Sequence, residues 1–396
     1  MEWKEVRLGD VCTRVCSGGT PKSTNLSYYG GEIPWLNTKE IDFNRIYSTE
    51  KTITDSGLNN SSAKWIVPNT VTVAMYGATA GKSCIVKVPM TTNQACCNLT
   101  INDEVADYEF VYYSLKNDYT TLASLANGGA QQNLNAQIIK DYVLKMPSLA
   151  DQRRIASILS SLDRKIELNN KINADLEEMA QAIFKNWFVD FEPFKDGRFV
   201  DSELGMIPEG WKVGSPYEYA KVVYGAPYKS AKFNDNGEGL PLIRIRDLKD
   251  CNPQFYTPEI LPQTEYVNMG DIVAGMDAEF VPHIWKGNTG LLNQRVCKLM
   301  PQQTSISNLF VLYLMKPELE FVQSYKTGTT VSHLGKADID KFVVVLPPLE
   351  VVEECSKILD SILQRIKNIS AESRTLSTLR DTLLPRLMSG EIEIPE

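Results

Sequence analysis

Two stretches of the chain, residues 150–185 and 350–386, carry the same heptad pattern at equivalent positions of the two halves. Read alternately every four and three residues, each stretch forms a seam along one helix face. The first seam is Ile155, Leu159, Leu162, Ile166, Asn169, Asn173, Leu176, Ala180 and Ile183. The second is Cys355, Leu359, Ile362, Ile366, Ile369, Ser373, Leu376, Arg380 and Leu383. Because a helix cannot bury a one-sided apolar stripe by itself, we expect the two helices to pack together as an antiparallel coiled coil. The alternative is that each helix covers its own domain.

The same offset, from Ile155 to Cys355, runs through the sequence that precedes the two helices. From about residue 92 to 184 the first half aligns with the second without a gap, matching Asn93-Gln94 with Asn293-Gln294 and Pro147 with Pro347. Before residue 92 the two halves diverge. Each half is therefore a variable front, a repeated frame and a long helix, which is the pattern of an internal duplication.

Short strands and helices are expected in these fronts and frames. β-Branched and aromatic residues between turn-forming residues predict strands at 32–36 and 71–75. Alternating apolar and basic residues predict a half-exposed strand at 242–246. Short helices are expected at 110–115 and 309–315.

A chain of 396 residues is too long for a single core. The sequence predicts an α+β protein with two mixed α/β domains in a pseudo-twofold arrangement, separated by the two long helices. The expected segments are a first domain at 1–148, a central helix at 149–190, a linker at 191–210, a second domain at 211–347, a distal helix at 348–388 and a tail at 389–396.

No apolar run of about 18 residues and no signal-peptide pattern occurs, so we expect a cytoplasmic protein with no membrane partner. The eight cysteines are scattered, which favours reduced thiols over disulfides or a zinc site.

Three motifs that could indicate an enzyme fall short of their patterns. Residues 77–83 resemble a phosphate-binding loop but are one residue short, and a β-run follows where a helix should begin. Residues 252–255, Asn-Pro-Gln-Phe, lack the second proline of the amino-methyltransferase signature. His283 and His333 have no neighbours that would complete a triad. We therefore expect no catalytic residue, no metal and no cofactor in this chain.

Polar loops punctuated by glycine occur at matching places in both halves. Asn, Gln, Lys and Arg hydrogen-bond to base edges in the major groove, and Ser and Thr suit phosphates. For any single loop, a solvated surface loop is the alternative. The candidate DNA contacts in the first half are Lys22, Asn37, Lys39, Tyr76, Thr79, Lys82, Gln131, Gln132 and Asn133. Those in the second half are Lys229, Arg244, Arg246, Lys286, Thr330, Ser332 and His333.

Several motifs in a fixed order carry a family resemblance. They are Gly-Gly-x-Ile-Pro-Trp at 30–35, Gly-Ala-Thr-Ala-Gly-Lys at 77–82, Pro-x-Leu-x-Asp-Gln-Arg-Arg-Ile at 147–155, Asn-Trp-Phe-Val-Asp-Phe-Glu-Pro at 186–193, Ile-Pro-Glu-Gly-Trp at 207–211 and Leu-Pro-Arg-Leu-Met-Ser-Gly-Glu-Ile at 384–392. With the duplication, essentially the whole chain resembles the specificity subunit of type I restriction-modification systems.

This resemblance implies two target recognition domains, each reading one half of a split site in double-stranded DNA. It further implies that the helices hold the domains apart and dock two methyltransferase subunits, with two motor-nuclease subunits completing the complex. S-adenosylmethionine and ATP are then expected only on those partners. The expected partner contacts are the charged outer faces and the repeated helix ends, namely Arg153, Arg154, Asp163, Phe184 and Leu384.

Two other functions are compatible with the same sequence features. One is a DNA-modifying enzyme that acts alone, which the absence of a cofactor loop disfavours. The other is a structural coiled-coil adaptor without a DNA role. A net charge of −8 argues against a surface that is basic all over, but it permits a local basic face.

Overall fold

The computed structural model describes residues 2–127, 133–326 and 333–392, which form two compact units. Unit 1 comprises residues 1–165 and 376–396, and unit 2 comprises residues 166–375. Each unit contains one front, one frame and segments of both long helices. The division therefore falls inside the helices, whereas the sequence placed the domain boundaries at the helix ends.

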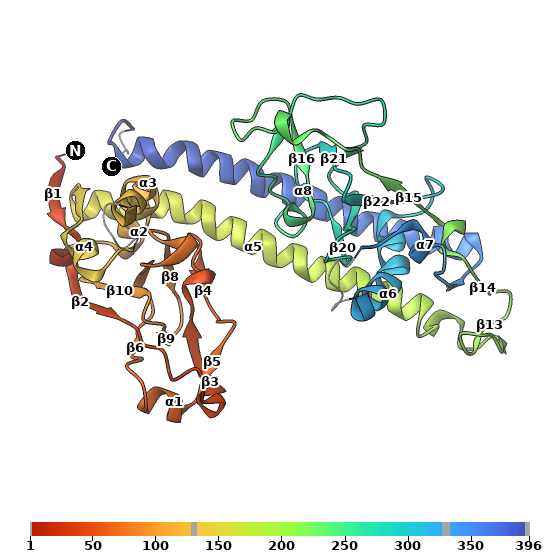
Figure 1. Ribbon diagram of the computed structural model, residues 1–396, viewed down its shortest axis with the longest axis horizontal. Coiled ribbons are helices and arrows are strands. Elements are labelled where there is room, and N and C mark those ends of the chain that lie inside the picture. Colours follow the sequence, from red (N-terminus) through yellow and green to blue (C-terminus); the bar gives the residue numbers. More distant parts are fainter. Residues whose placement is uncertain (1, 128–132, 327–332, 393–396) are drawn as a thin grey trace. The chain divides into compact units, whose positions relative to one another are not determined.

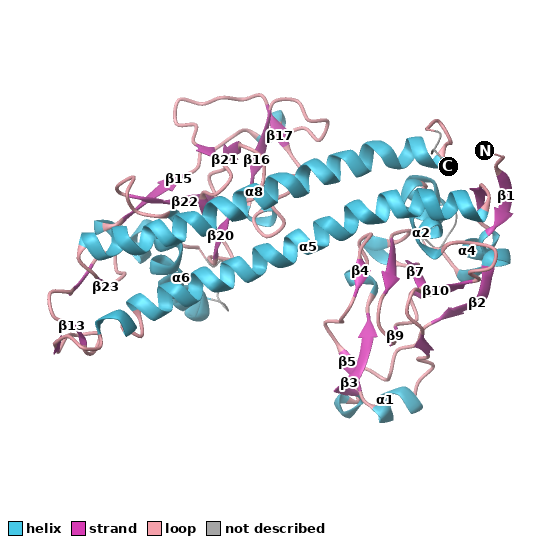
Figure 2. Ribbon diagram, turned by 180° about the vertical axis from the view of Figure 1, so that it is seen from behind, coloured by secondary structure: helices cyan, strands magenta, loops and turns pink. Residues whose placement is uncertain are grey.

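The two long helices are α5 (Leu149–Phe188) and α8 (Leu349–Met388), which occupy equivalent positions in the two halves, as predicted. In unit 2 they lie side by side and antiparallel (Figures 1 and 2). Asn169 Nδ2 donates a hydrogen bond to Ser373 Oγ at 3.2 Å, and Asn173 Nδ2 donates one to Ser370 Oγ at 3.1 Å. Because polar side chains in a coiled-coil seam pair only in one alignment, this layer specifies the register of the helix pair.

The segments of the two helices in unit 1 are also packed together. Ile155 and Leu159 of α5 share one hydrophobic core with Leu384 and Leu387 of α8. The predicted antiparallel coiled coil is thus confirmed, and the alternative in which each helix covers only its own domain is wrong.

The described residues of unit 1 form three sheets, with strand orders β2-β10-β7-β8-β4, β5-β3-β9-β6 and β1-β11. Its strands are β1 Lys4–Arg7, β2 Cys12–Ser17, β3 Tyr29–Leu36, β4 Arg45–Ile46, β5 Thr52–Ile53, β6 Trp65–Ile66, β7 Val71–Ala74, β8 Ser83–Val86, β9 Met90–Thr92, β10 Cys96–Ile101 and β11 Val143–Met146. Its shorter α-helices are α1 Asp55–Asn59, α2 Tyr108–Asn117, α3 Tyr119–Ser124 and α4 Ala136–Asp141. All of β7 is buried because α2 packs on this part of the sheet and a second cluster, which includes Leu36 and Met90, packs on Ala74.

Unit 2 repeats this arrangement with sheets β15-β22-β19-β20, β17-β16-β21-β18 and β14-β23, and adds the pair β12-β13. Strands β16, β17 and β21 can be followed in Figure 2. The strands are β12 Phe199–Val200, β13 Ile207–Pro208, β14 Lys212–Gly214, β15 Ala220–Tyr224, β16 Leu240–Ile243, β17 Tyr256–Thr257, β18 Tyr266–Val267, β19 Ile272–Gly275, β20 Pro282–Ile284, β21 Gly290–Leu292, β22 Val296–Pro301 and β23 Val344–Leu346. Its shorter α-helices are α6 Asn308–Lys326 and α7 Lys336–Ile339.

The repeated frame predicted from the sequence is present in both units. Strands β10 and β22 begin at equivalent positions of the two halves, as do α2 and α6. The backbone NH of Leu134 donates to the carbonyl of Met75 at 3.0 Å, and that of Leu334 donates to the carbonyl of Met276 at 2.7 Å. One difference stands out: β4 extends the main sheet of unit 1 beyond β8, while the matching sheet of unit 2 ends at β20 among the described residues.

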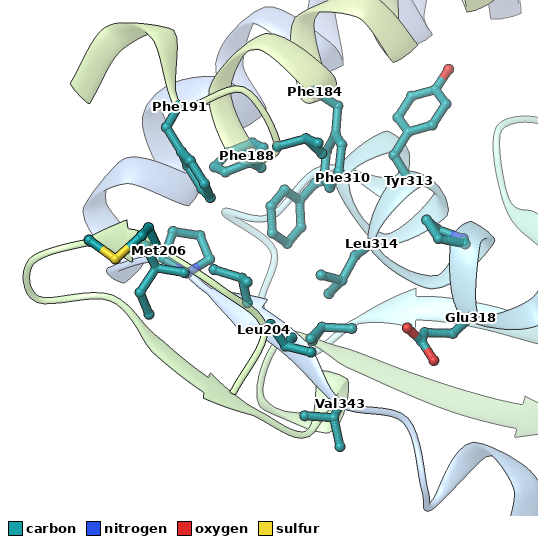
Figure 3. A pocket seen from close by; sticks show the side chains of 16 residues that line it. Phe184, Phe188, Phe191, Leu204, Met206, Phe310, Tyr313, Leu314, Glu318 and Val343 are labelled. Atoms are coloured by element: carbon teal, nitrogen blue, oxygen red, sulfur yellow. The ribbon is translucent and has the colours of Figure 1, made fainter. Parts of the chain in front are cut away.

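The segment predicted as a linker, 191–210, is folded against unit 2. Strands β12 and β13 pair within it, and the rings of Phe191 and Phe194 lie edge-on to Trp211 at 5.3 and 5.1 Å. Leu204 and Met206 from the same segment line an apolar pocket of about 300 Å³ (Figure 3). The aromatic residues that flank the acidic and glycine-rich part hold the segment in place.

The strand predicted at 242–246 ends earlier than expected. Leu242 and Ile243 are both buried, so the side chains do not alternate between core and solvent. The NH of Arg244 donates to Asp247 Oδ2 at 2.9 Å and starts the 3-10 helix η9 (Ile245–Asp247). This local cap ends the strand at Ile243.

Three of the five predicted partner contacts prove to be core residues. Asp163, Phe184 and Leu384 are only 7%, 8% and 6% exposed. The prediction that they form an exposed partner surface is therefore wrong. Elements distant in the sequence, chiefly α2 and α6, cover the helix faces on which these side chains lie.

Gln152 is a structural residue that the sequence motif did not reveal. It is 2% exposed, accepts a hydrogen bond from the NH of Asp107 at 3.0 Å and donates one to the carbonyl of Pro147 at 3.0 Å. We expect Gln152→Ala to lower the free energy of unfolding by about 1–3 kcal/mol, because it leaves buried backbone groups unpaired. Urea denaturation measures this, with exposed Gln181→Ala on the same helix as the control. Equal stability of the two variants would contradict the prediction.

Candidate nucleic-acid interface

The candidate surface of unit 1 begins where β3 ends. The NH of Asn37 donates to Glu40 Oε1 at 3.0 Å, and the NH of Lys39 donates to Asn37 Oδ1 at 3.4 Å. This reciprocal cap folds residues 38–40 into the 3-10 helix η3, since asparagine is a strong helix-capping residue. Lys39 is consequently held on the exposed side of the turn.

A second loop lies against the first. After β7 the chain forms the 3-10 helix η4 (Gly77–Thr79), and Thr79 Oγ1 donates to the carbonyl of Thr38 at 3.0 Å. Lys82 Nζ donates to Asp42 Oδ1 at 2.5 Å. Strand β8 follows directly at Ser83, as the sequence predicted, so the local fold is not that of a phosphate-binding loop.

The bond between Leu134 and Met75 adds two more candidates to this surface. Asn133 directly precedes Leu134, and exposed Tyr76 directly follows Met75, so both lie at the end of β7. The structure thus gathers Asn37, Lys39, Tyr76, Thr79, Lys82 and Asn133 at neighbouring strand ends of unit 1.

The basic residues of this surface are paired with carboxylates. Lys39 Nζ lies 2.6 Å from Glu50 Oε2, and this hydrogen bond is the main cause that raises the pKa of Lys39 and lowers the pKa of Glu50. Exposed ion pairs of this kind contribute little to stability.

Unit 2 builds the corresponding surface with different side chains. Arg244 takes the place of Asn37 in the cap, and its guanidinium lies 4.2 Å from the ring centre of Phe255, a cation–π contact. Arg246 is exposed on η9. A Cβ atom on Gly275, at the end of β19, would lie 3.2 Å from Ile245 Cγ2, so this turn packs against that strand end.

An acid and two basic groups lie beyond the end of β19. His333 Nδ1 is 2.7 Å from Asp277 Oδ1, and Arg295 Nε is 3.4 Å from Asp277 Oδ2. Sequence reasoning missed Arg295 and Asp277. The signal for Arg295 was available, because it directly follows the repeated Asn-Gln pair at 293–294.

The remaining candidates are not gathered with these groups. Lys286 Nζ lies 2.5 Å from Glu177 Oε1 of α5, so this residue faces the helix. Lys22 lies before the 3-10 helix η2 (Leu26–Tyr28), and Lys229 lies before the 3-10 helix η8 (Ser230–Lys232). The predicted contacts Gln131, Gln132, Thr330 and Ser332 lie outside the described residues.

Arg153 and Arg154, the other two predicted partner contacts, lie at the surface of unit 1. Arg153 is exposed and donates a hydrogen bond from Nη2 to the carbonyl of Asp103 at 3.2 Å. Arg154 Nη1 lies 3.5 Å from Asp151 Oδ1.

Catalytic and metal chemistry finds little support in the described part of the chain. No group of three or more His, Cys, Asp or Glu side chains within it could hold a metal ion. All eight cysteines are free, and burial raises the pKa of Cys12 and of Cys97 to about 12. Such thiols are poor nucleophiles because they stay protonated. None of the described helices is long and apolar enough to cross a membrane.

Two copies of one frame, each presenting polar loops at its strand ends, define a duplicated recognition protein. A family model described as the type I restriction modification DNA specificity domain matches residues 1–178 and 208–376. The chain belongs to this family, and it is a non-catalytic specificity subunit with DNA-recognition domains.

Named relatives and a solved structure agree with this membership. The MjaIX specificity subunit of Methanocaldococcus jannaschii is 28% identical over 427 residues, covering 100% of this chain and 94% of the relative. The MjaVIII specificity subunit of the same organism is 23% identical over 410 residues, covering 99% and 93%. The crystal structure of an S subunit of a type I restriction-modification system from M. genitalium matches with a TM-score of 0.56 at 16% identity, covering 98% and 96%. The fold is therefore that of an S subunit.

Proposed function

We propose that this subunit reads a split, asymmetric site in double-stranded DNA, one half-site with each unit. The observation that carries this proposal is that corresponding positions of the two units hold different side chains. Asn37 precedes the turn η3 in unit 1 and Arg244 precedes the turn η9 in unit 2, and Asn133 stands where unit 2 has His333. Amide side chains suit adenine and guanidinium groups suit guanine, so two such surfaces favour two different half-sites.

The proposal includes two methyltransferase subunits and two motor-nuclease subunits bound to this chain. A net charge of −8 and the carboxylates beside Lys39 and Lys82 leave few free positive charges for phosphates. Non-specific DNA affinity depends on the number of phosphates neutralised, so the partners supply much of that surface. Exposed Arg153 and half-buried Arg154 are the residues of α5 that we propose for a methyltransferase contact.

S-adenosylmethionine and ATP are proposed to bind only the partners. Equilibrium dialysis with labelled S-adenosylmethionine should show retention by the assembled complex and none by the isolated chain. Stoichiometric retention by the isolated chain would contradict this part of the proposal.

Methylome sequencing of cells that carry the complete system tests the recognition proposal. We expect a modified motif with two unlike half-sites separated by a gap of unspecified bases. A contiguous or palindromic motif would overturn the proposal. Binding of the complex to DNA without any sequence preference would instead favour a structural adaptor.

Asn133 and His333 occupy equivalent positions of the two halves and offer a matched pair of variants. We expect Asn133→Ala to weaken binding to DNA with both half-sites intact by about tenfold, since a base contact contributes about 1–3 kcal/mol. On DNA whose first half-site is scrambled, the Asn133→Ala variant and the wild type should bind with equal affinity. His333→Ala should weaken binding only when the second half-site is intact. Competition binding by the assembled complex measures both. Equal weakening on all sequences would show that these residues contact phosphates or nothing.

A further inference from the structure

A buried ionic cluster lies inside unit 1. Its centre is the carboxylate of Asp163 on α5. The hydroxyl of Tyr113, on α2, donates to Asp163 Oδ2 at 2.6 Å, and Arg380 Nη1, on α8, donates to Asp163 Oδ1 at 2.7 Å. Each carboxylate oxygen therefore receives a hydrogen bond from a different helix.

The cluster continues into the recognition domain through Arg45 of β4, whose side chain is only 3% exposed. Arg45 Nη2 lies 3.2 Å from Glu109 Oε1 and 3.3 Å from the Tyr113 hydroxyl, and Nη1 lies 3.8 Å from Asp163 Oδ2. In this cluster the guanidinium groups of Arg45 and Arg380 face the carboxylates of Glu109 and Asp163. Arg164, which is more exposed, adds a contact to Glu109 at 3.4 Å.

The duplication supplies an internal comparison for this cluster. The equivalent positions in the other half are Leu309 for Glu109, Leu363 for Asp163 and Ala180 for Arg380. All three are buried in the apolar core of unit 2. Tyr313, which corresponds to Tyr113, donates instead to the backbone carbonyl of Glu177 at 2.8 Å. The frame therefore folds with an apolar junction, and the charges are a feature of unit 1 alone among these equivalent positions.

The unit with the charges is also the one with the extra strand. Strand β4 pairs with β8 and places Arg45 in the junction, and among the described residues the matching sheet of unit 2 has no such strand. The chain reaches Arg45 directly from the candidate DNA loop, since Asn44 Nδ2 donates to the carbonyl of Glu40 at 3.0 Å. Holding Arg45 consequently holds the loop that carries Asn37 and Lys39.

Ionic and apolar junctions constrain a domain differently. Hydrogen bonds between charged groups are short and directional, so this network is satisfied in a narrow range of orientations. Apolar side chains remain in contact over a wider range, because burial is not directional. A buried charge that loses its partner is strongly unfavourable, which disfavours other orientations of the domain on the helices.

We propose that Asp163 and Arg380 are positioning residues that fix the orientation of the first recognition domain on the helix pair, and thereby the gap length that the complex accepts. The proposal rests on the proposed reading of a split site. One additional base pair in the gap moves a half-site by about 3.4 Å and about 35°. A rigidly held domain cannot follow this rotation, whereas a loosened one can.

The test uses the assembled complex and DNA duplexes that carry both half-sites with the natural gap or with one base pair more or fewer. We expect the wild type to bind the altered gaps at least about tenfold more weakly. Tyr113→Phe and Asp163→Asn should reduce this penalty to about threefold or less while leaving the base preference inside each half-site unchanged. Tyr113→Phe removes one hydroxyl and keeps the test decisive if Asp163→Asn does not fold.

Three controls separate positioning from a loss of stability. Tyr313→Phe is the matched change in unit 2. Leu99→Ala opens the core of unit 1 on β10, a strand that carries no residue of the ionic cluster. Both variants should keep the wild-type gap preference. Arg380→Lys, which keeps the charge, should preserve the preference that Arg380→Met loses. If the cluster variants weaken binding equally at every gap, as Leu99→Ala would, the proposal is wrong. A wild type without any gap preference would overturn the split-site proposal itself.

Discussion

Phe184→Ala is expected to lower the free energy of unfolding of unit 2 by about 3–5 kcal/mol, the usual cost of truncating a buried phenylalanine. The Phe184 ring lies 5.0 Å from the ring of Phe188, 5.6 Å from Phe310 and 5.7 Å from Tyr313 (Figure 3). Removing it leaves a cavity beside an existing apolar pocket, so the surrounding side chains have few ways to fill the space. Chemical denaturation followed by circular dichroism measures the change.

The control for this prediction lies five residues earlier on the same helix. Met179 is 53% exposed, and Met179→Ala should change the stability by less than about 0.5 kcal/mol. The comparison also separates a core role for Phe184 from a partner role. Loss of methyltransferase binding by Phe184→Ala with an unchanged unfolding curve would restore the partner contact that the structure argues against.

A matched insertion in both long helices is expected to change the gap that the complex recognises. Four residues inserted after Asn170 in α5 and four after Ala371 in α8 leave Asn169 opposite Ser373, and Asn173 opposite Ser370. They add about 6 Å and about 40° of rotation to the helix pair, close to the step of one base pair. We expect methylation of a site whose gap is one pair longer, with at least a tenfold loss at the original gap. This expectation takes the axis of the helix pair to run along the axis of the DNA.

An insertion in one helix alone is the control, because it breaks the alignment of the hydrogen bonds that Asn169 and Asn173 make with Ser373 and Ser370. Four residues inserted in α5 alone separate two hydrogen-bonded layers that the opposite helix still holds together. We expect this variant to lose methylation at both gap lengths, as assayed on paired plasmid substrates. A matched variant that keeps the original gap would show that the helices do not set the spacing.

The sequence alone determined the two long helices, their pairing and the repeated frame. Heptad spacing reports which helix face is apolar, and each seam continues far beyond the length of a chance pattern. The constant offset between the two halves placed β10 with β22 and α5 with α8, since the same local sequence signals occur in both copies. The strand at β7 followed from a short apolar run bounded by turn residues.

Only the tertiary structure decided which polar and aromatic residues are covered. Asp163 lies beside the seam and reads as a solvated charge, but Tyr113 and Arg45, both much earlier in the chain, converge on it. Phe184 is buried because α6 brings Phe310 and Tyr313 to its face of α5. The same holds for Lys286, which turns to Glu177 of α5. Periodicity records the local preference of one helix or strand, whereas long-range packing brings a second element onto its remaining faces, and nothing in the local pattern encodes that partner.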